Sequence, residues 1–189
     1  WNLRALASVF QGLVFTSPAT LKQPMMLARL YLHEAQRVYG DRMVNETDVE
    51  KFNEIVARQT KAHLGELDQE ELTAEPNLFA NFVTEDDAKF YLPITKGWKQ
   101  LSTILEDKLA EYNDTYAQMN LVLFNQAMEH VTRISRIIDN PRGNAMLVGV
   151  GGSGKQSLTR LAAYISGYSV FQVKLTSTYS IGDFKADLF

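Results

Sequence analysis

The sequence contains no cysteine, no long apolar run and no excess of basic residues. Without cysteine, a disulfide framework, a thiolate metal site and a thiol nucleophile are all excluded. No stretch reaches the roughly 20 apolar residues that a membrane-spanning helix needs, and no signal-peptide pattern opens the chain. The net charge is -3 and no basic face is apparent. We therefore expect neither a membrane nor a nucleic acid as a partner.

The composition fits a soluble globular protein. The chain has 189 residues, of which 46% are apolar and 22% charged, enough for one large domain or two small ones. Eight acids and no lysine or arginine lie between Glu66 and Asp87. We interpret this acidic stretch as a solvated surface loop, with a docking site for a basic partner as the alternative. Because the chain opens on Trp1 and stops at Phe189 without a terminating signal, we expect a piece of a longer polypeptide.

Apolar residues recur at helical spacing through most of the chain. The spacing predicts helices over residues 3–14 and 20–39, and Thr47-Asp48-Val49-Glu50 has the capping-box pattern for a third that continues to about Leu64. Two further helical faces are marked by Trp98, Leu101, Ile104, Leu105, Leu109 and Tyr112, and by Phe124, Ala127, Met128, Val131, Ile134 and Ile138. The first part of the chain is therefore expected to be nearly all helical.

The character changes after about residue 113. Residues 120–124 are apolar and could be extended, and residues 145–148 have the continuous apolar pattern of a buried strand in a parallel sheet. A glycine-rich loop follows, then a helix, and then a second apolar run over residues 169–175. The order strand, glycine loop, helix, strand places the chain in the α/β class, although most of it is helical.

The glycine loop has the composition and spacing of a phosphate-binding P-loop. Its residues are Gly149, Val150, Gly151, Gly152, Ser153, Gly154 and Lys155, with Gln156 and Ser157 next. Glycines let backbone N–H groups curl around an anion, the following helix adds its positive end, and the lysine supplies a charge to the β- and γ-phosphates. We take these nine residues as candidate nucleotide-binding residues for ATP or ADP. A glycine-rich turn without a ligand is the alternative.

One position departs from the motif. A serine or threonine normally follows the lysine and holds Mg²⁺, whereas this chain has Gln156 there. Ser157 stands about 100° further around the helix and does not simply replace it. We therefore expect phosphate binding to survive with weakened magnesium coordination. No acid follows an apolar strand, since Asp183 and Asp187 do not, and the histidines at 33, 63 and 130 are isolated. No catalytic or metal-ligating residue is assigned.

The run from Asn140 to Ala162 closely resembles the P-loop of the fourth AAA+ module in axonemal dynein heavy chains, and the Gln156-Ser157 pair is itself typical of that module. Residues 119–124 resemble the segment leading into it. The opening residues 1–12 resemble the first lid helix of the preceding module. The resemblance covers most of the chain, is weakest across the acidic stretch, and leans toward an outer-arm heavy chain.

The resemblance implies a division of the chain. Residues 1–111 would be the helical lid of the third AAA+ module, and residues 112–189 the first, incomplete part of the α/β subdomain of the fourth. By its place in the Asn-Leu-Arg pattern, Arg4 matches the sensor 2 arginine, which contacts the γ-phosphate of its own module's nucleotide. The family usually has an acid after this arginine, where this chain has Ala5.

The resemblance also implies a function. Dynein heavy chains are ATP-driven, minus-end-directed microtubule motors that power ciliary and flagellar beating. Their first module hydrolyses most of the ATP, and the third and fourth modules bind nucleotide and regulate the ring. Expected partners are the neighbouring AAA+ modules and, through the whole complex, intermediate chains, light chains and microtubules, which the coiled-coil stalk contacts. The expected location is the axoneme of a cilium or flagellum, within the cytoplasm and cytoskeleton.

Two other functions are compatible with the residues alone. One is a self-contained P-loop kinase or small NTPase, against which the short α/β part counts, because two strands cannot form a complete nucleotide-binding sheet. The other is a purely helical interaction module in which the glycine loop has lost its ligand.

Overall fold

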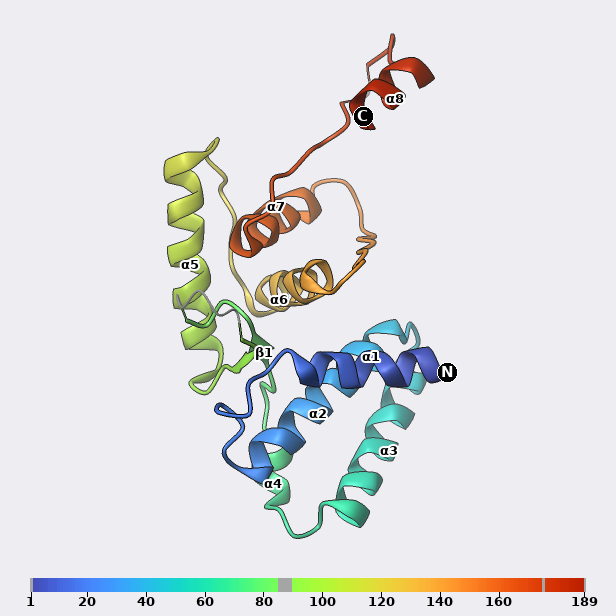
Figure 1. Ribbon diagram of the computed structural model, residues 1–189, viewed down its shortest axis with the longest axis vertical. Helices are drawn as coiled ribbons and strands as arrows, with labels where there is room; N and C mark the ends of the chain where they lie inside the picture. The colour runs from blue at the N-terminus through green and yellow to red at the C-terminus, as the bar shows by residue number, and fades with distance from the viewer. Residues whose placement is uncertain (1, 85–89, 175, 189) are drawn as a thin grey trace.

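The chain is mostly helical, as the apolar spacing predicts (Figure 1). The computed structural model describes residues 2–84, 90–174 and 176–188. In chain order the elements are α1 (Leu3–Val14), α2 (Pro24–Val38), the 3-10 turn η1 (Gly40–Arg42), α3 (Glu46–His63), α4 (Gln69–Thr73), β1 (Phe79–Ala80), β2 (Leu92–Pro93), α5 (Gly97–Thr115), α6 (Asn125–Asp139), α7 (Lys155–Ser166) and α8 (Ile181–Leu188). None of the helices in these ranges is long and apolar enough to span a lipid bilayer.

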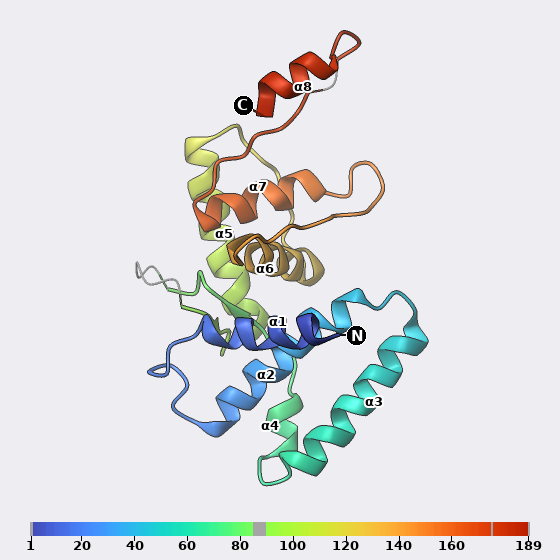
Figure 2. The ribbon, with the colours of Figure 1, turned by 45° about the vertical axis from the view of Figure 1, so that its right-hand side comes forward.

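The first four helices form one end of the molecule (Figure 1). Asn2 caps α1, since its side chain accepts a hydrogen bond from the Ala5 amide at 3.1 Å. Ala5 and Val9 then pack with Val38 of α2 in a small apolar cluster. By contrast, Thr60 is the buried residue of α3, and the helix stands away from α2 in both ribbon views (Figure 2).

The main core lies where α5, α6 and α7 meet. Its fully buried members include Leu101 and Leu105 of α5, Val131 of α6, and Leu161 of α7. In Figures 1 and 2, α6 lies between the α1–α2 pair below and α7 above. The helix that precedes the glycine loop and the helix that follows it are therefore packed directly together. This core spans the boundary at residues 111 and 112, and the division of the chain there stays a prediction.

A short antiparallel pair of strands separates the two ends. Phe79 pairs with Pro93 and Ala80 with Leu92. Phe79 also stacks on Tyr91 with ring centroids 6.1 Å apart, and both pack on Leu30 of α2 in a second small cluster. β1 lies within the acidic stretch that was expected to be a solvated loop, and β2 lies just after it.

The loop interpretation of the acidic stretch is wrong for its described part. Asp68 caps α4 by accepting hydrogen bonds from the amides of Glu70 and Glu71, and Leu72 of that helix is fully buried. Apolar side chains between the acids supply the burial that orders the segment. Residues 85–87, which carry three of the acids, lie outside the described residues.

Two helix starts also differ from the prediction. The second helix begins at Pro24, not at residue 20, because proline fits the first position of a helix, where its missing N–H group costs nothing. The third begins at Glu46 after Asn45, so Thr47 lies inside it and the capping box assigned at Thr47 is wrong.

The two predicted strands flanking the glycine loop are wrong for their described residues. Among the residues that the structure covers, only β1 and β2 pair as strands. Residues 145–148 and 169–174 have no strand partner, and Met146, Val148 and Phe171 are largely exposed. Leu175 lies outside the described residues. A strand in a parallel sheet needs hydrogen-bonded neighbours on its edges, and these two segments do not supply them for each other. Residues 120–124, whose apolar pattern is compatible with an extended segment, form no strand either.

Candidate functional site

At two positions of the glycine loop, the backbone adopts a conformation that only glycine tolerates well. Gly152 and Gly154 both have a φ of 77°, in the left-handed region. A Cβ atom added at Gly151, Gly152 or Gly154 would meet no other atom within 4 Å. The side of the loop that carries these glycines is therefore open, with room for a ligand to approach the backbone.

Lys155 folds back over the loop. Its Nζ donates hydrogen bonds to the carbonyl oxygens of Gly149 and Val150, both at 2.6 Å, and to Ser153 Oγ at 3.0 Å. A Cβ at Gly149 would lie 3.0 Å from Ser153 Oγ and 3.4 Å from this Nζ, so glycine there allows the close approach. The lysine charge is thus held at the centre of the loop.

The helix that follows the loop offers unpaired amides. Gly154 is the N-cap of α7 and has no side chain that could accept hydrogen bonds from the first turn. The first amide bonded within the helix is that of Leu158, which donates to the Gly154 carbonyl oxygen at 2.9 Å. The amides before it lie at the positive end of the helix, close to Lys155. Open glycines, a central ammonium group and a helix start fit a phosphate group.

The same site does not fit a magnesium ion well. Gln156 is exposed on the first turn of α7, where the motif would place a hydroxyl group, and Ser157 is half-buried. Within the described ranges, no group of three or more His, Asp or Glu side chains is arranged to hold a metal ion. Asp183 accepts hydrogen bonds from Ser180 at the start of α8, and Asp187 accepts one from Tyr179.

Arg4 does not join the glycine loop. It is exposed on the first turn of α1, and α6 lies between α1 and α7 in both ribbon views (Figures 1 and 2). The nine loop residues are consecutive in the chain and lie together at the start of α7, and the arginine lies apart from them. A sensor 2 arginine contacts the nucleotide of its own module, so this separation leaves the role of Arg4 untested.

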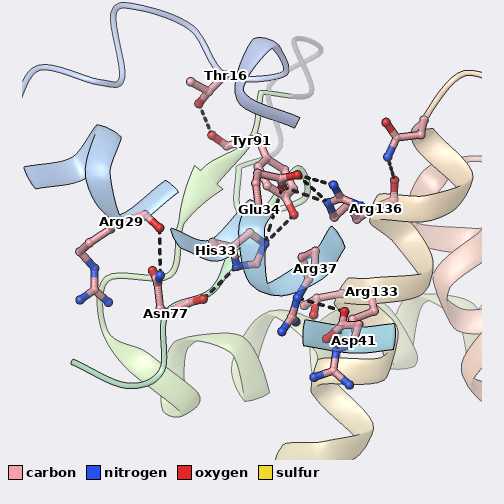
Figure 3. Close-up of polar contacts among 12 residues, drawn as sticks. Thr16, Arg29, His33, Glu34, Arg37, Asp41, Asn77, Tyr91, Arg133 and Arg136 are labelled. Atoms are coloured by element: carbon pink, nitrogen blue, oxygen red, sulfur yellow. Dashed lines mark hydrogen bonds and ion pairs between the residues drawn. The ribbon is translucent and has the colours of Figure 1, made fainter. Parts of the chain in front are cut away.

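A buried ion pair connects α2 to α6 (Figure 3). Glu34 is fully buried, and Arg136 donates hydrogen bonds to both of its carboxylate oxygens, from Nε at 3.0 and 3.2 Å and from Nη2. Burial lowers the pKa of Arg136, but the hydrogen bonds and the charge of Glu34 outweigh it and raise that pKa above its ordinary value. Gly12 of α1 covers the carboxylate so closely that an added Cβ would overlap it.

His33 is buried beside this pair as a neutral ring. Nδ1 lies 2.9 Å from the Asn77 carbonyl oxygen, which can only accept, so Nδ1 carries the proton. Nε2 then accepts a hydrogen bond from the Tyr91 hydroxyl at 3.0 Å. Burial, with the nearby charges of Arg37, Arg136 and Arg133, lowers the pKa of His33 from 6.5 to about 3. Glu34 lies 4.0 Å away and does not reverse this shift.

Acid is therefore expected to destabilise the fold through His33. In the unfolded chain the ring takes up a proton below pH 6.5, whereas in the folded chain it stays neutral to about pH 3. The stability that the neutral ring provides is complete above pH 6.5 and falls as the pH drops. Between pH 7 and pH 5 this group alone should cost about 2 kcal/mol of unfolding free energy. Urea unfolding at both pH values measures the loss.

Two variants separate this effect from general acid sensitivity. His33→Gln cannot be protonated and should show a pH 7 to pH 5 difference smaller by about 2 kcal/mol. His63→Gln, at an exposed position on α3, should keep the wild-type difference. Equal pH dependence in the wild type and in His33→Gln would contradict the assignment.

The sequence did not reveal this polar cluster. His33, Glu34 and Arg37 interrupt the apolar face of α2, and Arg133 and Arg136 lie three residues apart on α6 beside its apolar stripe. Polar residues on an otherwise buried helical face are a signal that such positions have partners. The spacing alone does not identify those partners, because Glu34 and Arg136 are far apart in the sequence.

Comparison with known proteins gives the family. Residues 1–74 match the AAA+ lid domain, and residues 119–189 match the P-loop containing dynein motor region D4. The ciliary dynein beta chain of Tripneustes gratilla and human dynein axonemal heavy chain 17 are both 50% identical over 188 residues, which cover 100% of this chain and 4% of each relative. The flagellar outer-arm dynein beta chain of Chlamydomonas reinhardtii is 49% identical over 193 residues, with the same coverage. The chain belongs to the axonemal dynein heavy chain family.

The chain thus spans a small part, about 4%, of the length of the dynein relatives it matches. Within it, the two matched regions are joined by the buried ion pair, since Glu34 lies in the lid match and Arg136 in the D4 match. The glycine loop lies wholly within the D4 match.

Proposed function

We propose that this chain is a nucleotide-binding regulatory part of the AAA+ ring of an axonemal dynein heavy chain. The observation that supports it most is the loop itself, in which Lys155 lies at the centre of open glycines at the start of α7. ATP or ADP is the proposed ligand. The phosphates of this nucleotide would supply the negative charge that these groups recognise. Hydrolysis of ATP for the motor would take place in another module of the ring.

Each residue proposed to hold the nucleotide has a specific role in binding it. Gly151, Gly152 and Gly154 leave the backbone accessible, Lys155 places a positive charge beside the phosphates, and the amides at the start of α7 donate to them. Arg4 is proposed to serve a different nucleotide, that of the preceding module. The proposed boundary between the two modules stays near residues 111 and 112. This chain alone is not expected to hydrolyse ATP.

The wider function is proposed from the relatives. Their names are ciliary, axonemal and flagellar dyneins. We therefore propose that the chain works within a minus-end-directed microtubule motor in the axoneme of a cilium or flagellum. Its direct partners would be the neighbouring AAA+ modules of the heavy chain. Intermediate chains, light chains and microtubules would be contacted through the whole complex.

Replacing Lys155 with alanine tests the nucleotide site. Loss of the central ammonium group should weaken binding of a fluorescent ATP analogue by at least about tenfold, which corresponds to about 1.4 kcal/mol. Lys185→Ala, an exposed lysine on α8, is the matched control and should bind as the wild type does. Equal binding by the wild type and Lys155→Ala would favour the alternative in which the loop has no ligand.

Magnesium should matter little to this binding. Because Gln156 replaces the hydroxyl that normally holds the ion, the ATP affinity should change by less than about threefold when Mg²⁺ is replaced by EDTA. Equilibrium titration under both conditions measures the ratio. Gln156→Thr restores the hydroxyl and should increase the ratio. A large Mg²⁺-dependent gain together with rapid turnover in the wild type would contradict the prediction.

A further inference from the structure

Arg160 is an exposed arginine in the middle of α7, the helix that begins at the glycine loop. Within the part of the chain that the structure describes, its guanidinium is held by one hydrogen bond, from Nη2 to Gln172 Oε1 at 2.6 Å, and none of the ion pairs there includes it. Arg133 and Arg136 of α6, by contrast, are each held by an acid. The charge of Arg160 is therefore held only by a neutral amide.

The position of Arg160 on α7 places it on the same face as Gln156. The two residues are four apart, and residues four apart on a helix are neighbours on one face. The rise between their Cα atoms is about 6 Å, and a helical side chain lies over the turn that precedes its own Cα. The opposite face carries Leu158 and Leu161, which are buried in the main core. Arg160 thus belongs to the exposed face of α7, one turn from the phosphate-binding end.

The charges of α7 all have one sign. Its charged side chains are Lys155 and Arg160, and it contains no acid. Both cations lie in the first half of the helix, whose N-terminal end is already positive, so they add to the positive potential around the loop. An anion at the loop would compensate this potential, and a more negative anion would do so to a greater extent.

The face that carries Gln156 is where the motif normally neutralises the last phosphates of a nucleotide. A hydroxyl group after the lysine holds Mg²⁺, which bridges oxygens of the β- and γ-phosphates. Gln156 has no hydroxyl group, and Lys155 supplies a single charge to the same phosphates. A bound triphosphate would therefore need a second cation of the chain at its γ-phosphate. On α7 that cation is Arg160.

We propose that Arg160 makes the glycine loop prefer ATP over ADP by donating hydrogen bonds to the γ-phosphate. This inference rests on the proposed nucleotide site. A guanidinium group matches phosphate oxygens with its fork of donors and is always charged at neutral pH. Arg160 would exchange the neutral Gln172 oxygen for a charged phosphate oxygen, which forms the stronger hydrogen bond. ADP ends at the β-phosphate, so it would engage Lys155 and the α7 amides without Arg160.

The test is a calorimetric titration of ATP and of ADP into the 189-residue chain in EDTA, so that no magnesium ion takes the place of the arginine. The wild type should bind ATP at least about tenfold more tightly than ADP. Arg160→Gln should weaken ATP binding by about tenfold and change ADP binding by less than about threefold, so that the preference disappears. Arg160→Lys, which keeps the charge without the fork, should fall between the two.

Two further variants separate nucleotide recognition from a structural role. Gln172→Ala removes the hydrogen bond that joins Arg160 to the segment after α7, and it should keep the preference for ATP. Arg58→Gln removes an exposed arginine from α3, which lies far from the loop (Figure 1), and should leave the binding of both nucleotides unchanged.

The outcomes distinguish this inference from the nucleotide site on which it rests. Equal binding of ATP and ADP by the wild type, or an unchanged preference in Arg160→Gln, would overturn the role of Arg160 and leave the nucleotide site in place. The same loss of preference in Gln172→Ala and Arg160→Gln would also overturn it, because the arginine would then act only by holding the segment after α7. Absence of binding by both nucleotides would contradict the site itself and this inference with it.

Discussion

Replacing Gly12 with alanine should destabilise the fold by about 3 kcal/mol or more, although the same change inside a helix normally stabilises by up to about 1 kcal/mol. The reason is that Gly12 packs directly on the Glu34 carboxylate. A Cβ atom at this position would overlap the carboxylate oxygen Oε2 of Glu34. To make room, either α1 must move off α2 or Glu34 must leave Arg136. The second outcome breaks a buried ion pair. Urea unfolding at pH 7 measures the loss.

Gly182→Ala provides the matched control for this result. Gly182 lies in α8, and its added Cβ would come no closer than 3.4 Å to another atom, Ser180 Oγ. This variant should be neutral or slightly more stable than the wild type. If Gly12→Ala were also neutral or stabilising, the close packing of α1 on Glu34 would be contradicted.

Arg136→Met should cost about 3–5 kcal/mol of unfolding free energy. Glu34 would remain fully buried without a counter-charge, and its carboxylate would lose the hydrogen bonds that Arg136 supplies. Burial of an uncompensated charge is among the most costly single changes in a protein. Thermal or urea unfolding, followed by circular dichroism, gives the difference.

A second substitution separates loss of the charge pair from loss of packing. Glu34→Met combined with Arg136→Met replaces both charges with apolar side chains and should recover most of the loss. Arg160→Met, which removes an exposed arginine from α7, should change the unfolding free energy by less than about 0.5 kcal/mol. A cost below about 1 kcal/mol for Arg136→Met would mean that the pair does not hold α2 to α6.

These two predictions concern the link between the lid helices and the glycine loop. Arg136 anchors α6 on α2, and α6 packs against α7 through the main core. The loop lies between α6 and α7 in the chain. The position of the loop relative to the lid therefore depends on a contact that includes no loop residue.

The helices and the glycine loop could be predicted from the sequence because their signals are local. Apolar spacing identified α1, α5 and α6 closely, and the loop residues from Gly149 to Lys155 have the fixed spacing of the motif directly before a helical pattern. The groups that Lys155 contacts lie within a few residues of it in the sequence. Local sequence is therefore sufficient to predict these helices and the loop.

The features that the sequence did not reveal depend on distant partners. Nothing near Glu34 indicates that its partner is Arg136, and β1 and β2 are two-residue strands with no periodic signal. The predicted strands are wrong over residues 145–148 and 169–174 for a related reason. Their apolar pattern is strong, but strand pairing requires neighbours that the described part of the chain does not place beside them.

The central claim is that the glycine loop binds nucleotide, and hydrogen exchange tests it most directly. Backbone amides from Val150 to Ser157 should exchange more slowly when ATP is added, because phosphate oxygens would accept hydrogen bonds from them. Amides of α3, which lies far from the loop (Figure 1), should exchange at the same rate with and without ATP. ATP that leaves exchange in the loop unchanged, or that slows it only elsewhere, would contradict the claim.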